Sequence, residues 1–87
     1  MASKRKLYLR ALNNPQGLRF EEFTALIVAF GFEFRRQSGS HRIYGRPDIA
    51  KRVNVQPLAD GKAKAAQVRE FMKMVDRHRL DVEEDAP

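Results

Sequence analysis

Apolar residues recur at helical spacing in three stretches of the chain, and each stretch predicts a helix. The first spans about residues 3–12 and the last about residues 63–79. The second ends before Gly31, a residue suited to the left-handed backbone that often follows a helix. The positions expected to face the core are Leu7, Tyr8 and Ala11 in the first helix, Phe20, Phe23, Leu26, Ile27 and Phe30 in the second, and Val68, Phe71, Met72 and Val75 in the third.

Alternating polar and apolar residues between the second and third helices predict three strands, at about residues 32–37, 40–44 and 52–56. Phe32 and Phe34 form the apolar side of the first strand. A short turn at Ser38-Gly39 separates the first two strands, and residues 45–48 form a loop before the third. The element order α-α-β-β-β-α predicts an α+β domain. Its three-stranded antiparallel sheet is expected to carry the helices on one face.

The orientation of the second strand affects the chemistry, because the strand begins near a histidine. Strict alternation puts His41 on the same face as Ile43, which is expected to point toward the helices. Either His41 lies clear of the core at the strand end, or a bulge at Gly39-Ser40 turns its side chain away.

The length and composition are typical of one small globular domain. The chain has 87 residues, and we expect a single domain over residues 1–80 followed by an acidic, flexible tail at 81–87. It has no cysteine, which excludes disulfides and thiolate metal sites. The longest strongly apolar run, residues 25–30, is too short to cross a bilayer. The basic N-terminus is not followed by the apolar segment of a signal peptide, so we expect a cytosolic protein.

The charge indicates a polyanionic partner. There are 17 Lys and Arg against 11 Asp and Glu, and four of these acids lie in the tail, so residues 1–80 carry 17 basic and 7 acidic side chains. A field of this sign concentrates nucleic acid near the protein surface.

His41 is the best candidate for chemistry, because it follows a Gly-Ser turn within a basic segment. Arginine binds phosphate in a bidentate manner, and histidine exchanges protons near neutral pH. RNA supplies its own nucleophile, the 2′-hydroxyl, so cleavage requires no metal ion or cofactor. We expect His41 to transfer the proton, Gly39 to form the turn, and RNA to be bound by Arg35, Arg36, Ser40, Arg42, Arg46, Lys62 and Lys64. We read the second histidine, His78, as a structural residue at the end of the last helix.

The segment Gly31-Phe32 followed by residues 36–44, Arg-Gln-Ser-Gly-Ser-His-Arg-Ile-Tyr, resembles the HicA family of type II toxin–antitoxin toxins. The resemblance covers about residues 18–80, with an extra N-terminal helix before it. It implies a fold like that of double-stranded-RNA-binding domains, ribosome-independent cleavage of mRNA, and neutralisation by a HicB-type antitoxin. The family's catalytic histidine falls on His41. The sequence departs from the usual pattern at Arg42, at residues 53–57 and at residues 60–64, which indicates a divergent branch of the family.

Two alternatives to a nuclease are considered. Non-catalytic double-stranded-RNA-binding domains have the same element order, and a lysine cluster at the start of their last helix contacts phosphates. Lys62 and Lys64 form a weak version of that cluster. A helix-turn-helix DNA-binding domain fits less well, because the two strongest helices flank the strands and do not adjoin each other.

Overall fold

The computed structural model describes residues 4–81 and has the predicted element order. The predicted helix start at Ser3 and all but the first residue of the predicted acidic tail lie outside these residues. In chain order the elements are α1 (Lys4–Asn13), the 3-10 turn η1 (Pro15–Gly17), α2 (Phe20–Ala29), β1 (Glu33–Ser38), β2 (His41–Arg46), β3 (Ile49–Val55) and α3 (Ala65–Arg77).

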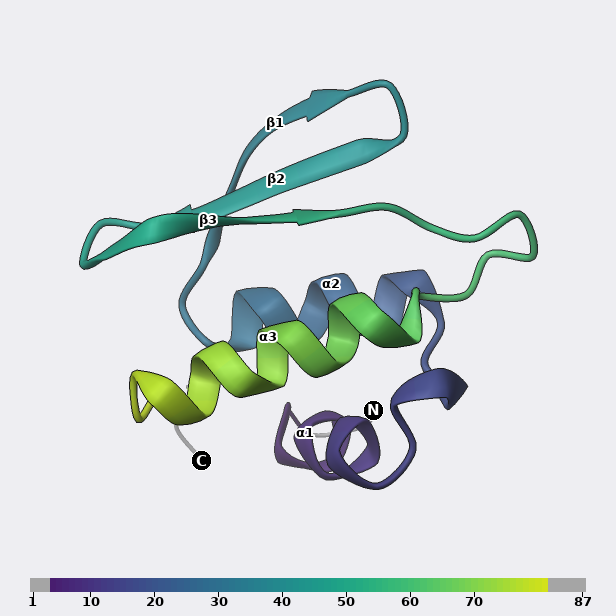
Figure 1. Cartoon of the computed structure of the whole chain (residues 1–87), viewed down its shortest axis with the longest axis horizontal. Helices are drawn as coiled ribbons and strands as arrows, with labels where there is room; N and C mark the ends of the chain where they lie inside the picture. Colours follow the sequence, from purple (N-terminus) through teal and green to yellow (C-terminus); the bar gives the residue numbers. More distant parts are fainter. Residues whose placement is uncertain (1–3, 82–87) are drawn as a thin grey trace.

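The structure has three layers (Figure 1). The strands form an antiparallel sheet in the order β1-β2-β3. α2 and α3 cover one face of this sheet, and α1 lies on the far side of these two helices. The other face of the sheet carries no helix among the described residues, so its side chains are open to solvent or to a partner.

Aromatic rings from three elements meet at Phe71 of α3, between the helices and the sheet. The rings of Phe23, Phe30 and Phe32 pack edge-to-face on Phe71, with centroids 5.6–5.9 Å away. Gly31, at φ +88°, ends α2 and lets Phe32 enter the core at once. These contacts join α2, α3 and the start of the sheet into one core.

Most of the predicted core positions are buried, but Leu7 and Tyr8 of α1 are only partly buried, and α3 and β1 each differ at one position. Met74 is buried in α3, whereas Met72, which was assigned to the apolar stripe, is only partly buried. Phe34 was expected to join the core through the apolar side of β1, but its side chain is 54% exposed. Its ring contacts Tyr44 at 5.8 Å between centroids, and β1 is an edge strand that lies beyond the helices. The helical layer is therefore too narrow to cover Phe34.

The loop predicted at residues 45–48 is mostly strand. β2 continues to Arg46, which pairs with Ile49 at the start of β3, so only Pro47 and Asp48 form the turn. The register shifts at Gly45, between Tyr44 and Arg46. Only Gly45 of β2 lies between these two pairs, opposite residues 50–52 of β3, so the extra residues of this bulge belong to β3.

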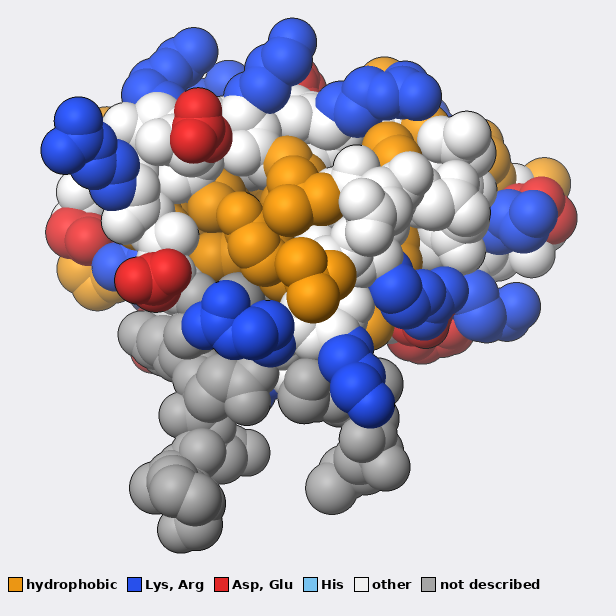
Figure 2. Space-filling view, turned by 90° about the horizontal axis from the view of Figure 1, so that it is seen from below, with side chains coloured by type: hydrophobic (Ala, Val, Ile, Leu, Met, Phe, Trp, Pro, Cys, Tyr) orange, Lys and Arg blue, Asp and Glu red, His pale blue; other side chains and the backbone are white. Residues whose placement is uncertain are grey.

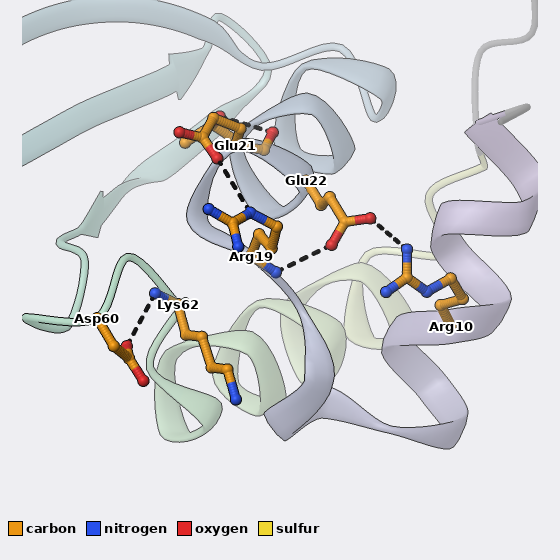
Figure 3. Close-up of polar contacts among 7 residues, drawn as sticks. Arg10, Arg19, Glu21, Glu22, Asp60 and Lys62 are labelled. Carbon is orange, nitrogen blue, oxygen red and sulfur yellow. Dashed lines mark hydrogen bonds and ion pairs between the residues drawn. The ribbon is translucent and has the colours of Figure 1, made fainter. Parts of the chain in front are cut away.

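α1 is attached to α2 by aromatic packing and by charge. The Tyr8 ring packs on Phe30 at a centroid distance of 5.5 Å. Arg10 forms an ion pair with Glu22, whose carboxylate also accepts a hydrogen bond of 3.0 Å from the backbone N–H of Arg19 (Figure 3). The backbone hydrogen bond, followed by the Arg10 contacts, lowers the pKa of Glu22 despite its partial burial. Glu22 thus caps α2 and also fixes α1 to it.

The face of the molecule opposite the sheet exposes hydrophobic side chains. Figure 2 shows hydrophobic side chains gathered in the middle of this face, with Lys and Arg side chains around them. On α1, Leu9 and Leu12 are about half exposed, at 48% and 50%. None of the helices described over residues 4–81 is long and apolar enough to cross a membrane.

Candidate nucleic-acid interface

The hairpin between β1 and β2 turns at Gly39-Ser40, one residue later than predicted. Ser38 pairs with His41 across the turn, which makes His41 the first residue of β2. Gly39 has a φ of +60° and Ser40 does not have a positive φ, the pattern of a two-residue type II′ turn. The Gln37 side chain donates a hydrogen bond of 3.0 Å to the Gly39 carbonyl and supports this turn.

His41 lies on the face of the sheet that points away from the helices, whereas strict alternation with Ile43 had predicted the helix side. Tyr44 is buried at 4% exposure against the helices, and the Arg42 guanidinium carbon lies 5.1 Å from the centroid of the Phe20 ring. Because side chains alternate along a strand, His41 and Ile43 project from the opposite, open face. The expectation that Ile43 points toward the helices was wrong, because Tyr44 fills the core position. The described structure has no bulge at Gly39-Ser40; the register shifts lie at Arg35 and Gly45.

His41 is held by an asparagine from the neighbouring strand. Its Nδ1 lies 2.9 Å from Oδ1 of Asn54, on β3. An amide oxygen only accepts hydrogen bonds, so this contact places the proton of the neutral imidazole on Nδ1 and leaves Nε2 as the basic nitrogen. Asn54 was not among the predicted site residues. Its place on the polar side of β3 was visible in the alternation, but the contact depends on the β2–β3 register.

The bulge at Arg35 places two consecutive arginines on the open face. Arg36 pairs with Ile43 and therefore shares the face of Ile43 and His41. Arg35 lies in the register shift, where two residues of a bulged strand point to the same side. Nε of Arg35 lies beside Gly45, and so does Nη1 of Arg52 from β3. The open face of the sheet thus combines His41 and Asn54 with Arg35, Arg36 and Arg52, and we call this set the basic sheet face.

Two of the predicted phosphate-binding arginines lie elsewhere. Arg42 points to the helix side, where it borders a hollow between the hairpin turn and the loop before α3. This hollow is lined by Phe20, Glu21, Gln37, Ser40, Arg42, Pro57, Leu58, Ala59 and Gly61. Arg46 lies at the far end of β2 from His41 and is fully engaged. It donates to the Phe30 carbonyl at 2.6 Å and to both carboxylate oxygens of Asp48 at 2.9 Å, and its guanidinium carbon lies 5.8 Å from the Phe32 ring centroid.

The two predicted lysines lie at the entrance to α3. Lys64 is the N-cap residue of the helix, and the backbone N–H of Lys62 donates to Asp60 Oδ1 at 3.1 Å (Figure 3). The adjacent Gly61 lines the same hollow as Ser40 and Arg42. The lysines therefore belong to the start of α3 and not to the basic sheet face.

Among the described residues, several arginines on the helix side or at the sheet end have carboxylate partners, whereas those of the open face have few. Arg10, Arg19 and Arg46 have carboxylate partners within 4 Å on the helix side or at the sheet end. On the basic sheet face, Arg35 has a single long contact of 3.7 Å to Glu33, and the described residues provide no carboxylate for Arg36 or Arg52. Within residues 4–81, no three His, Asp or Glu side chains are grouped to hold a metal ion. The face is therefore a cationic surface with a histidine at one end.

The comparisons with known proteins give one match. The family model described as the HicA toxin of bacterial toxin–antitoxin systems matches residues 20–76. This segment begins with α2, contains the whole basic sheet face and ends in α3, so α1 lies outside it. Curated proteins and solved structures gave no match.

Proposed function

Because this chain belongs to the HicA family of bacterial toxin–antitoxin toxins, we propose that it is an endoribonuclease that cleaves mRNA in the cytosol without a ribosome or a metal cofactor. The observation that carries the proposal is the contact between His41 and Asn54, which leaves Nε2 of His41 as the basic nitrogen on an open, arginine-rich face. A histidine in this setting has the positive surroundings and the free nitrogen that phosphodiester cleavage requires.

The proposed reaction uses the nucleophile that RNA contains. Nε2 of His41 accepts the proton of a 2′-hydroxyl, and the 2′ oxygen attacks the adjacent phosphorus. The bond to the 5′ oxygen breaks, which leaves a 2′,3′-cyclic phosphate and, after protonation by water, a 5′-hydroxyl. Arg36 stabilises the charge that develops on the phosphate oxygens. It lies on the same face as His41, two residues before Ser38, the residue that pairs with His41.

The other predicted RNA-binding residues take different roles in this proposal. Ser40 and Arg42 line the hollow beside the hairpin turn, and Lys62 and Lys64 follow Gly61 of that hollow in the chain, so these four residues are assigned to RNA that leaves the basic sheet face. Arg46 is already bound to Asp48 and to the Phe30 carbonyl, and we assign it a structural role. The Arg46 guanidinium would have to break three hydrogen bonds before it could bind a phosphate in a bidentate manner.

The family implies a cognate antitoxin, and we propose a HicB-type protein that covers the basic sheet face around His41. A partner that supplies acidic side chains would match the free charges of Arg36 and Arg52 and exclude RNA from the histidine. An antitoxin complex in which His41 and Arg36 stay open to solvent would contradict this part of the proposal.

Expression in a bacterial host tests the proposed activity. Inducible expression of the chain should arrest growth, and His41→Ala should relieve the arrest while the variant accumulates to the same level. His78→Ala is the matched control, because His78 is exposed in the C-cap of α3 and its backbone, not its ring, makes the capping hydrogen bond. Arrest by His41→Ala as strong as that of the parent would contradict the catalytic assignment.

A non-catalytic RNA-binding module is the alternative, and Lys62 and Lys64 at the start of α3 are the feature that favours it. Such a module would bind RNA in a salt-dependent manner and release no fragments. Its toxicity would come from binding alone and would survive the loss of His41.

A further inference from the structure

Gly45 lies on the central strand β2, opposite the bulged segment of β3, where arginines from both neighbouring strands approach it. A Cβ atom at Gly45 would lie 3.3 Å from Nε of Arg35 and 3.6 Å from Nη1 of Arg52. Gly45 is buried, so these side chains cover its backbone. Arg35 comes from β1 and Arg52 from β3, which means that the two guanidinium groups converge over the central strand.

Two cations this close together need a negative charge, and the described residues supply little of it. The two nitrogen atoms are at most about 7 Å apart, since both lie within 3.6 Å of the same point. Among residues 4–81, only the exposed Glu33 has a carboxylate within 4 Å of either guanidinium group, at 3.7 Å from Arg35. A phosphate accepts hydrogen bonds of about 2.7–2.9 Å from each of two guanidinium groups, so its size suits this separation.

We propose that Arg35 and Arg52 form a binding site for one backbone phosphate of single-stranded RNA, above Gly45. This site rests on the proposed function, which places the cleaved phosphodiester at His41. Gly45 lies four positions after His41 along β2, or about 13 Å, which corresponds to about two nucleotides of extended RNA. The substrate strand therefore follows β2, and the Arg35–Arg52 pair fixes its position and direction relative to the histidine.

The absence of a side chain at Gly45 is part of the site. Its φ is not positive, so a larger residue has no backbone penalty there, but a Cβ would press against the two guanidinium groups. Gly45→Val should therefore weaken phosphate binding without any change in charge.

RNA binding by a catalytically inactive protein tests the site independently of cleavage. In a His41→Ala background, R35Q/R52Q should weaken binding of a labelled single-stranded RNA by about tenfold. It should also lower the slope of log K against log salt by about 0.7, the value for one phosphate contact on a single strand. The matched control is R69Q/R77Q, which removes two exposed arginines from α3.

A neutral methylphosphonate linkage moved along the RNA locates the phosphate. One position, about two nucleotides from the cleavage site, should weaken binding of the His41→Ala protein and have no further effect on the R35Q/R52Q variant. Equal affinity and equal salt slope for R35Q/R52Q and R69Q/R77Q would overturn the proposal, as would unchanged affinity in Gly45→Val. If the parent does not cleave RNA, the proposed function fails, and these binding measurements still decide the phosphate site.

Discussion

His41 and Asn54 face each other across β2 and β3 with 2.9 Å between Nδ1 and Oδ1. The contact orients the imidazole and selects its tautomer, because the hydrogen bond at one ring nitrogen determines which nitrogen carries the proton. It also links the first residue of β2 to a residue thirteen positions later in the chain.

The neutral His41 ring should therefore carry its proton on Nδ1, and ¹⁵N NMR of the imidazole measures this directly. Asn54→Leu, which keeps the size of the side chain and removes the acceptor, should shift the proton to Nε2. It should also slow RNA cleavage by about 10- to 100-fold. Asn54→Asp restores an acceptor and should recover most of the rate at saturating RNA. An Nε2–H tautomer in the parent protein would refute this role of Asn54.

Arg46 should contribute to stability and not to RNA recognition. Arg46→Ala removes the hydrogen bond to the Phe30 carbonyl and exposes the Phe32 ring, and we expect it to lower the free energy of unfolding by about 1–2 kcal/mol. Urea denaturation measures this change. Arg36→Ala is the comparison, because it should leave the unfolding midpoint within error and weaken RNA binding. The reverse result for the two variants would return Arg46 to the RNA-binding set.

Glu22 should make stability depend on pH. Its folded pKa is lowered, chiefly by the Arg19 backbone N–H, so its stabilising effect is present above its unfolded pKa and is lost as pH falls through its folded value. At pH 7, Glu22→Gln should lower the free energy of unfolding by about 1 kcal/mol, because the amide can still accept the Arg19 hydrogen bond but loses the negative charge and the Arg10 ion pair.

At pH values low enough to protonate the parent carboxyl as well, the two proteins should have similar stability. Thermal unfolding across this pH range measures the difference. A difference that stays constant with pH would show that the carboxylate charge of Glu22 is not responsible.

The elements could be predicted because their signals are local. Phenylalanine spacing and Gly31 define α2, and Gly39 marks the hairpin turn, although the turn was predicted at Ser38-Gly39, one residue too early. The orientation of β2 could not be predicted, because Ile43 and Tyr44 are adjacent and both apolar. Only the packing of Tyr44 under the sheet decides between them.

Only the part of the candidate site with a local sequence signal could be predicted. His41 stands out by its type and its basic neighbours. The contact of Asn54 with His41 and the convergence of Arg35 and Arg52 over Gly45 depend on the strand register and on two bulges, which bring together residues far apart in the chain. Arg46 was assigned to RNA by its charge. Its contacts with Asp48 and Phe30 depend on where β2 ends, and the sequence had placed Arg46 in a loop at residues 45–48.

The central claim is that His41 cleaves RNA without a metal ion, and one measurement tests it most directly. Purified protein is incubated with end-labelled single-stranded RNA in excess EDTA, beside the same sequence as DNA, and the products are separated by size. We predict RNA fragments that end in a 2′,3′-cyclic phosphate, no cleavage of the DNA, and loss of the fragments in His41→Ala but not in His78→Ala. RNA that stays intact across the neutral pH range, or fragments produced equally by His41→Ala, would contradict the claim.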